Sequence, residues 1–532
     1  MSRARLASLA IAALTATAGQ AHASGPLEYP DNGSASFSRG GAWLATATDP
    51  IAAHYNPAGL VTQSSGASLE MNFAFNKVCF DRRNPGDAQT GPNQDTKDAP
   101  ADSIEYRPAC NNHNGYPRFV PSAALAYRYS ETLAFGFAIV PPAAYGTAEG
   151  EWSPTERGFN TRTREVVYVP SPYRFMTVGN RSTILFPTLS AATSFGDLRV
   201  GAGFIWGFAL IDVESFGMSR VSPLDQGDHK NDDSRSRLRT DDLFVPGFVL
   251  GTLWSATPNI DIAGWFRWVD YVRTTQGEVD ITTQYYVNPR PTQTISGGDF
   301  RMFEFPLPPE LRLGVRFHVP RAKPGPKINP STFDVEPEPT GFSTRDPLRD
   351  DVFDVELNGS YTFNAANDRI KVRFIKGDAG QAIRIVEPGR LPPNADRATG
   401  YKDSIGVRLG AQYNAIANKL GLRAGTWVET AAADDEFLNV SPVPALRGGY
   451  GGGVVLRQNR FDFQLGYQYH WSAGMDNHGN GALRAGAGVR DLDEFRLGQD
   501  PLEQQFRSYH SVNGGKVTQS AHVFTLGGIY RF

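Results

Sequence analysis

The chain has 532 residues, of which 52 are basic and 55 are acidic, so its formal net charge is −3. No basic cluster is long enough to neutralise several phosphates, which argues against a nucleic-acid partner. The mean hydropathy is −0.36 and no stretch approaches about 18 consecutive apolar residues, which excludes membrane-spanning helices. A membrane barrel is still allowed, because its strands are apolar on one face only.

The first 23 residues have the pattern of a secretory signal peptide. Arg3 and Arg5 form the charged region, Leu6 to Ala18 the apolar region, and Ala21-His22-Ala23 a cleavage site. A retained membrane anchor is the alternative, but the apolar run is shorter than the roughly 20 residues that a bilayer needs. We expect residues 1–23 to be removed and the mature chain to begin at Ser24.

A segment rich in small residues follows, from Gly33 to Leu60, and it lacks the alternation of a membrane strand. It carries Arg39 and ends with Asn56-Pro57-Ala58-Gly59-Leu60. Pro57 fixes its own φ and keeps Asn56 out of helical geometry, so the chain turns here. Because the rest of the chain alternates like a barrel, the economical place for this segment is inside the barrel, as a plug.

This segment resembles the N-terminal hatch of the FadL-type outer-membrane transporters of long-chain fatty acids and other hydrophobic compounds. The resemblance rests on the Gly/Ser-rich run with Arg39, on Ala45 to Asp49, and on Asn56, Pro57 and Ala58. It implies a hatch over residues 24–60, with Leu27 directed toward a ligand pocket. It also implies that the Asn56 turn anchors the hatch against the barrel wall, although an ordinary turn into the first strand explains the same residues.

Cys79 and Cys110 are the two cysteines of the chain, and both lie in one stretch rich in Asn, Asp, Pro and Gly. In an exported protein such a pair is expected to form a disulfide that closes the loop between them. A metal site is the weaker interpretation, because His113 is the only soft ligand nearby and the spacing fits no zinc pattern. We expect neither a metal nor a cofactor.

The pattern over residues 61–532 is alternation of apolar and polar residues, as in Phe461, Phe463 and Leu465 against Asp462 and Gln464. A soluble sandwich also has strands with one apolar face, but aromatic residues near strand ends and alternately short and long connections favour a membrane barrel. We predict an all-β fold, a transmembrane antiparallel β-barrel of about 14 strands, the number that the family resemblance implies. The strands are expected near 66–77, 118–130, 132–141, 181–195, 198–214, 241–256, 260–275, 307–319, 351–375, 401–414, 419–430, 449–457, 460–472 and 520–532.

The connections between these strands assign the two ends of the barrel. Short turns are expected at the periplasmic end and large loops at the extracellular end. The exception is the Pro-rich stretch 320–350, which would be a long periplasmic turn and to which the sequence assigns no role.

The final predicted strand ends on an aromatic residue, Phe532, with Tyr530, Leu526 and Phe524 on the same face. This ending resembles the C-terminal strand that the outer-membrane assembly machinery reads, so that machinery is an expected partner through Phe532. We expect a multi-pass barrel in the outer membrane of a Gram-negative bacterium, in contact with membrane lipid.

Pro141 and Pro142 follow the third predicted strand. Neither proline can donate to a ladder, so strand pairing must fail there. The family resemblance implies a gap in the barrel wall at a kinked third strand. The ordinary end of the strand explains the prolines as well.

The predicted loop 142–180 supplies apolar side chains for an outer ligand groove, whereas the loop 215–240 is rich in Asp, Ser and Arg. The groove candidates are Phe159, Tyr168, Tyr173, Phe175 and Met176. If the ligand carries a carboxylate, an arginine of the lumen should pair with it, because an ion in an apolar pocket needs a partner. The candidates are Arg199, Arg267, Arg312, Arg316 and Arg408.

We therefore expect an outer-membrane transport protein for hydrophobic small molecules, first among them long-chain fatty acids. The family resemblance implies passive diffusion gated by the hatch, with lateral release through the barrel wall. One rival is a surface receptor or adhesin whose loops bind a macromolecule. Another is a lipid-hydrolysing barrel enzyme, but no nucleophile signature accompanies the strand histidines His318, His470 and His522, so we expect no enzymatic activity.

Overall fold

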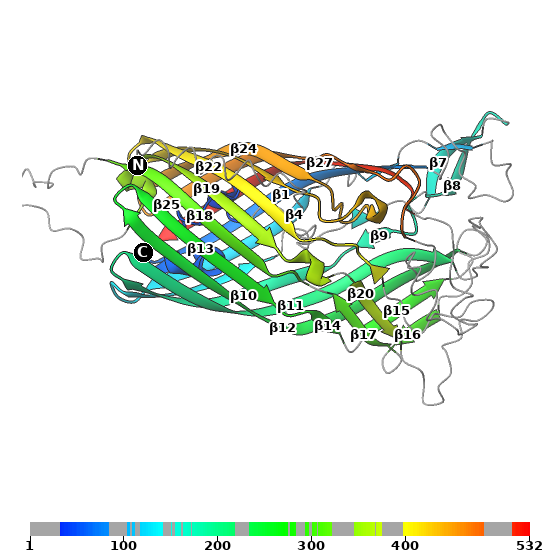
Figure 1. Ribbon diagram of the computed structural model, residues 1–532, viewed down its shortest axis with the longest axis horizontal. Coiled ribbons are helices and arrows are strands. Elements are labelled where there is room, and N and C mark those ends of the chain that lie inside the picture. Colours follow the sequence, from blue (N-terminus) through cyan, green and yellow to red (C-terminus); the bar gives the residue numbers. More distant parts are fainter. Residues whose placement is uncertain are drawn as a thin grey trace, which may run out of the picture.

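The structure is a computed structural model, drawn in Figure 1. It describes residues 32–83, 104–106, 109–111, 117–141, 150–151, 155–160, 163–171, 173–218, 233–274, 277–282, 293–296, 300–305, 307–321, 345–367, 369–374, 397–483 and 513–532. The predicted signal segment 1–23, Leu27 and Pro142 lie outside these residues. Within these ranges no helix is long and apolar enough to cross a membrane.

Fourteen antiparallel strands close into a barrel, as predicted. Each strand pairs with the next one along the wall, and the last pairs with the first from Gly66 to Arg82. In order they are β1 (Gly66–Arg82), β4 (Arg118–Arg128), β5 (Leu133–Val140), β10 (Thr183–Phe195), β11 (Leu198–Met218), β12 (Asp233–Thr257), β13 (Ile260–Val269), β18 (Glu310–Pro320), β19 (Asp351–Thr362), β22 (Ser404–Ile416), β23 (Leu420–Glu429), β24 (Arg447–Gln458), β25 (Phe461–Ser472) and β27 (Gly515–Arg531).

The outside of the barrel is apolar and the inside is polar over much of its surface. On β18, Leu313 and Val315 are 61% and 49% exposed, whereas the neighbouring Arg312 and Arg316 are buried. The period of two along a strand produces this division, because successive side chains point to opposite faces. A closed ladder leaves no edge strand unpaired in hydrocarbon, and an exposed apolar belt matches the lipid. The chain is therefore an outer-membrane barrel.

The two ends of the barrel differ in their connections (Figure 1). At the left end, tight turns join the strands, and Gly196, Asn418 and Asn459 adopt positive φ in them. Gly and Asn tolerate that conformation best, which suits them to these turns. The same end holds the C-terminus and the helix α4 (Pro347–Asp350) of the β18–β19 connection, and we take it as the periplasmic end.

The opposite, extracellular end carries the remaining elements, which lie on the right in Figure 1 where they are labelled. These elements are β2 (Ile104–Tyr106), β3 (Ala109–Asn111), β6 (Gly150–Glu151), β7 (Thr155–Asn160), β8 (Glu165–Pro170), β9 (Thr177–Asn180), β14 (Val272–Thr274), β15 (Gly277–Thr282), β16 (Gln293–Ser296), β17 (Phe300–Phe305), η6 (Asn364–Asn367), β20 (Arg369–Phe374), β21 (Arg397–Ala398), η7 (Asp435–Phe437) and β26 (Met475–Asp476).

β11 and β12 are longer than predicted, because part of the expected loop 215–240 is strand. The two strands stay paired up to Met218 and Asp233, and Arg235 and Arg237 pair across the ladder with Glu214 and Asp212. Charges alternate in this extension instead of apolar residues. A search for one apolar face therefore places the strand ends too early.

The predicted disulfide between Cys79 and Cys110 is present, with an S–S distance of 2.05 Å. Cys79 lies on β1 and Cys110 directly opposite on β3. The bridge fastens a strand of the extracellular loop to the barrel wall.

Residues 32–63 lie inside the barrel, and every one except Thr48 is buried. Their short helices are α2 (Ser34–Phe37), α3 (Ala52–Tyr55) and the 3-10 turn η1 (Pro57–Thr62). These helices contact β4, β5, β10, β11, β12, β25 and β27, so the segment touches the wall on several sides. The expected boundaries at residues 23 and 60 stay predictions.

Candidate functional site

Arg39 ties the segment inside the barrel to the charged side of the wall. It is fully buried, its Nη2 donates to Asp354 Oδ1 on β19 at 2.5 Å, and its Nε donates to the carbonyl of Ala42 at 2.9 Å. The backbone of Arg39 also packs directly against β23. A Cβ placed on Gly425 would overlap the carbonyl group of Arg39, so this contact requires glycine in the wall.

Glu356, also on β19, holds the stretch that the sequence singled out at Ala45 to Asp49. Its Oε1 accepts from the backbone N–H of Ala45 at 2.8 Å. Its Oε2 accepts from the backbone N–H of Thr46 at 3.0 Å and from the Thr46 hydroxyl at 2.6 Å. A buried carboxylate needs such donors, and here the hatch backbone supplies them.

Asn56 and Pro57 fix the last turn of the segment against β12. The Asn56 Nδ2 donates to the carbonyl of Leu44 at 2.9 Å and to that of Thr252 on β12 at 3.2 Å. Its Oδ1 accepts from the backbone N–H two residues further on, at 3.2 Å. A Cβ on Gly251 would lie 2.8 Å from Pro57 Cδ. The turn therefore contacts the wall closely, beyond what a simple entry into the first strand requires.

The helix α3 meets an aromatic cluster on the wall. The ring of His54 stacks on Phe186 of β10 with centroids 6.1 Å apart, and the Trp265 indole N–H donates to the His54 carbonyl at 3.0 Å. Burial, and then the charges of Arg267 and Arg312, lower the pKa of His54 to about 3. The imidazole is therefore neutral at ordinary pH and acts as an aromatic packing group.

The inner surface of the barrel has two unlike walls. One, which we call the apolar wall, consists of inward-facing glycine and aliphatic residues on β11 and β12. They are Gly201, Gly203, Ile205, Gly207, Ala209 and Ile211 on β11, and Val245, Gly247, Val249, Gly251 and Leu253 on β12. The other, the charged wall, consists of inward-facing polar residues on β18, β19 and β22, which follow β13 along the barrel. They are Glu310, Arg312, Arg316 and His318 on β18, Asp354, Glu356, Asn358 and Ser360 on β19, and Arg408, Gln412 and Asn414 on β22.

Comparison with solved structures gives this arrangement a context. The chain is similar to a Pseudomonas aeruginosa FadL homologue, at 14% identity and a TM-score of 0.61, covering 95% of this chain and 99% of that one. It is also similar to the Pseudomonas putida toluene transporter TodX, at 13% identity and a TM-score of 0.52, covering 95% and 98%. The Ralstonia pickettii toluene transporter TbuX matches at 15% identity and a TM-score of 0.50, covering 94% and 99%.

The chain has the FadL-type fold. The match covers nearly the full length of both chains. No protein-family model matches the sequence, and no curated protein matches it. The similarity is therefore one of structure, found at an identity where sequences have diverged widely.

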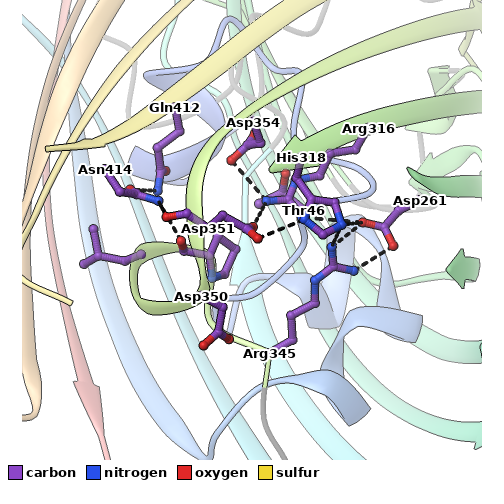
Figure 2. A network of polar contacts seen from close by, with 12 residues as sticks. Thr46, Asp261, Arg316, His318, Arg345, Asp350, Asp351, Asp354, Gln412 and Asn414 are labelled. Atoms are coloured by element: carbon purple, nitrogen blue, oxygen red, sulfur yellow. Dashed lines mark hydrogen bonds and ion pairs between the residues drawn. The ribbon is translucent and has the colours of Figure 1, made fainter. Parts of the chain in front are cut away.

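At the periplasmic end of this FadL-type barrel, charged side chains form the network of Figure 2. The Arg316 Nη2 donates to Asp351 Oδ2 at 2.6 Å and to Asp354 Oδ2 at 3.1 Å, and His318 Nδ1 lies 2.8 Å from Asp351 Oδ1. Asp354 is the same carboxylate that receives Arg39. Arg316, one of the five candidate arginines, therefore pairs with two carboxylates of β19, one of which also binds Arg39.

Arg267 on β13 and Arg312 on β18 lie nearer the extracellular end, where the apolar and charged walls meet. Arg312 Nε lies 2.6 Å and Arg267 Nη2 lies 3.7 Å from the two oxygens of Glu310. Arg312 also stacks over Trp265, with its guanidinium carbon 4.9 Å from the ring centroid. Two arginines thus share one carboxylate beside an aromatic ring. The last two candidates bind elsewhere: Arg408 pairs with Glu429, and Arg199 donates to Ser255 near a turn.

The five predicted groove residues fall in two places in this FadL-type barrel. Tyr173, Phe175 and Met176 are buried in one apolar cluster with residues of the 431–446 loop, including Leu438 and Val440. Phe159 lies on β7 and Tyr168 on β8, in a separate three-stranded sheet that stands away from the barrel in Figure 1. Phe159 is 41% exposed there. Of the five, only Tyr173, Phe175 and Met176 come together, at the extracellular end of the barrel.

Pro141 lies just past the end of β5, and the β5 ladder with β10 is unbroken from Leu133 to Val140. The carbonyl of Pro141 accepts from Asn32 Nδ2 at 2.7 Å, so the proline contacts the segment inside the barrel. On the neighbouring strand, the β10–β11 ladder is interrupted over two residues while its register is kept. Between β10 and β11 the pairs stop at Leu185 and resume at Thr188, which leaves Phe186 and Pro187 without a ladder partner on β11. Pro187 has no N–H to donate, which explains the break.

Sequence reasoning missed Asp354, Glu356 and Trp265, although each had a partial signal. The two acids occupy the inward positions of a strand whose outward face is apolar, which is where a polar residue must have a partner. Trp265 lies among Phe266, Arg267 and Trp268, where aromatic residues occur on both faces and the inward side cannot be recognised. The strand histidines separate: His318 and His470 face the lumen, and His522 faces outward against Tyr467.

Proposed function

We propose that this protein admits hydrophobic small molecules across the outer membrane by passive diffusion, without making or breaking a bond in them. The observation that carries the proposal is the apolar wall, a strip of glycine and aliphatic residues inside a barrel whose other wall is charged. A pore for hydrophilic solutes has no use for such a strip, whereas an apolar solute needs one. Two structurally similar proteins, TodX and TbuX, are toluene transporters, and a third is a FadL homologue. This similarity supports the same class of solute.

Within that class we propose carboxylate amphiphiles, first of all long-chain fatty acids. The support is the position of Arg267 and Arg312 at the edge of the apolar wall. A carboxylate that entered there would meet two guanidinium groups, each with five N–H donors, beside Glu310. An acyl chain bound there would lie along the glycine and aliphatic strip. The second candidate is a neutral aromatic hydrocarbon, favoured by the structural similarity to the toluene transporters TodX and TbuX.

The proposed route begins at the apolar cluster of Tyr173, Phe175 and Met176 and follows the apolar wall inward. It ends at the break beside Pro187, where the missing β10–β11 pairs weaken the wall toward the lipid. The lumen is filled along this route by close packing around α3 and η1. The hatch must therefore shift for a ligand to pass, which makes it the gate.

Uptake by cells with and without the gene tests the proposal, using labelled oleate and labelled toluene in parallel. Arg312→Met keeps much of the side-chain volume and removes the charge, and Arg273→Met is its control, because Arg273 is 51% exposed outside the lumen. We expect Arg312→Met to lower oleate uptake at least tenfold and to leave toluene uptake within twofold. Toluene uptake alone would identify the hydrocarbon class. Uptake of neither would refute transport and favour a surface receptor.

A charge placed in the apolar wall gives a second test of transport. Val249→Asp places a carboxylate among aliphatic groups, so it should abolish uptake of either class while the folded barrel persists on unboiled gels. Recovery of the labelled compound chemically unchanged checks that no hydrolysis accompanies uptake.

A further inference from the structure

The β18–β19 connection is described again at residues 345–350, to which the sequence assigned no role. Pro347 and Leu348 are buried, and Asp346 caps α4 by accepting from the Leu348 N–H at 3.1 Å. A periplasmic turn has no need to bury apolar side chains in the barrel. We call residues 345–350 the latch.

The first end of the latch is fixed to β13, β18 and the end of the hatch. Arg345 Nη1 donates to Asp261 Oδ1 on β13 at 2.7 Å, and Nη2 lies 2.8 Å from His318 Nε2 on β18. Its backbone N–H donates to the carbonyl of Thr62, the last residue of η1, at 2.8 Å. Figure 2 shows Arg345 directed from this chain segment toward Asp261 and His318.

The next three residues of the latch are fixed to β22, the β22–β23 turn and β24. The Asn414 Nδ2 donates to the carbonyl of Pro347 at 2.6 Å, and the backbone N–H of Asn418 donates to that of Leu348 at 2.8 Å. Asp346 forms an ion pair with Arg457 on β24. The strands from β13 to β24 are six consecutive strands of the fourteen. The contacts of the latch at the periplasmic end therefore reach nearly half of the wall.

The latch is not simply packed on the hatch, because a polar cavity separates parts of the two. Ala35, Trp43 and Asp49 of the hatch line this cavity on one side, and Asp346, Pro347 and Leu348 of the latch line it on another. Among the described residues, the segment 32–63 therefore leaves part of the periplasmic end of the barrel unfilled. The latch supplies the floor.

We propose that residues 345–350 are a second closure, a periplasmic latch that seals the barrel beneath the hatch. Hatch and latch then lie in series, and an aqueous path to the periplasm forms only when both have moved. Besides its hydrogen bonds with Thr62, Asn414 and Asn418, the latch is attached by two ion pairs, Arg345 with Asp261 and Asp346 with Arg457, both at the edge of the buried interior. Removing Arg345 and Asp346 together releases both attachments without altering the barrel wall.

Thiol labelling of the full chain tests the latch. Ala35→Cys places a thiol on the cavity, where Ala35 is 3% exposed, and the two native cysteines are joined in a disulfide and cannot react. The purified protein in detergent is treated with a polar maleimide, and the labelling rate is followed by mass. We expect R345A/D346A to raise the rate at least tenfold. R349A, an arginine of the same segment whose side chain pairs with the adjacent Asp350, should stay within twofold.

A reversible lock separates latch opening from damage to the barrel. A Cβ on Gly421 would lie 3.0 Å from Leu348 Cδ1, which makes L348C/G421C the pair to oxidise in order to hold the latch to β23. Added to R345A/D346A and oxidised, this pair should return labelling to the slow rate, and mild reduction should restore the fast one. Equal rates with and without R345A/D346A would overturn the proposal, as would fast labelling that the oxidised lock fails to slow.

Discussion

Replacing Arg39 by alanine tests whether the hatch is held shut by its pairing with the charged wall. Both side chains of the Arg39–Asp354 pair are 0% exposed, so the pair is not screened by solvent. Removing one member of a buried pair costs about 3 to 5 kcal/mol, because the other charge is left uncompensated. Asp354 keeps Arg316 at 3.1 Å, which places the expected loss at the lower end, about 3 kcal/mol. At about 1.4 kcal/mol per tenfold, the population with a displaced hatch should rise about 100-fold.

Ion conductance of the purified protein in planar bilayers measures that population, provided the latch is released in the same background by R345A/D346A. R39A should then raise the frequency of open events by about two orders of magnitude. R273A is the matched control, since an exposed arginine pair contributes at most about 1 kcal/mol. Adding D354N to R39A should recover part of the loss, because the neutral amide needs no counter-charge. Open events within twofold of the latch-released parent would refute the reasoning.

Three further predictions follow from other contacts. Gly251→Ala should displace the hatch turn at Pro57 and raise conductance, whereas Gly359→Ala, where a Cβ meets nothing within 4 Å, should leave it unchanged; equal effects would exclude the steric explanation. Replacing Cys79 and Cys110 by serine should destabilise the loop between them by about 3 kcal/mol, seen as faster proteolysis from the extracellular side with the barrel intact on unboiled gels; unchanged proteolysis would contradict this. Deleting Phe532 should lower the yield of folded protein in the outer membrane severalfold. An undiminished yield would mean that the assembly machinery does not need Phe532.

The barrel could be predicted from sequence because one strong constraint repeats along it. Lipid requires an apolar residue at every second position, so runs such as Leu311, Leu313 and Val315 identify strands without knowledge of their partners. The rule fails where a strand leaves the lipid. In the outer part of β12, Arg235 and Arg237 alternate with small polar residues, and cross-strand ion pairs replace the apolar belt as the stabilising contact.

The site was harder to predict because it is assembled from distant positions. Arg39 could be recognised as a hatch residue, but its partner Asp354 is 315 positions away. The residues around the Asn56 turn were identified, whereas the glycines that admit them, such as Gly251, look like any other glycine of a strand. The gap in the wall at Pro141 and Pro142 stays a prediction, because Pro142 lies outside the described residues. Pro187, which the sequence did not single out, interrupts a ladder, because which proline does so depends on the register of the facing strand.

The unlike walls of the lumen have a consequence for how related sequences drift apart. An aliphatic side chain such as Ile205 touches its neighbours only through dispersion, so it can be exchanged singly, changing the shape of the passage in small steps. A buried ionic group such as Arg316 cannot change without its acidic partners, because any one of them left behind would be a stranded charge. Descendants adapting to a new solute should therefore vary freely at the aliphatic positions of β11 and β12, while the arginines and acids across from them change only as matched sets.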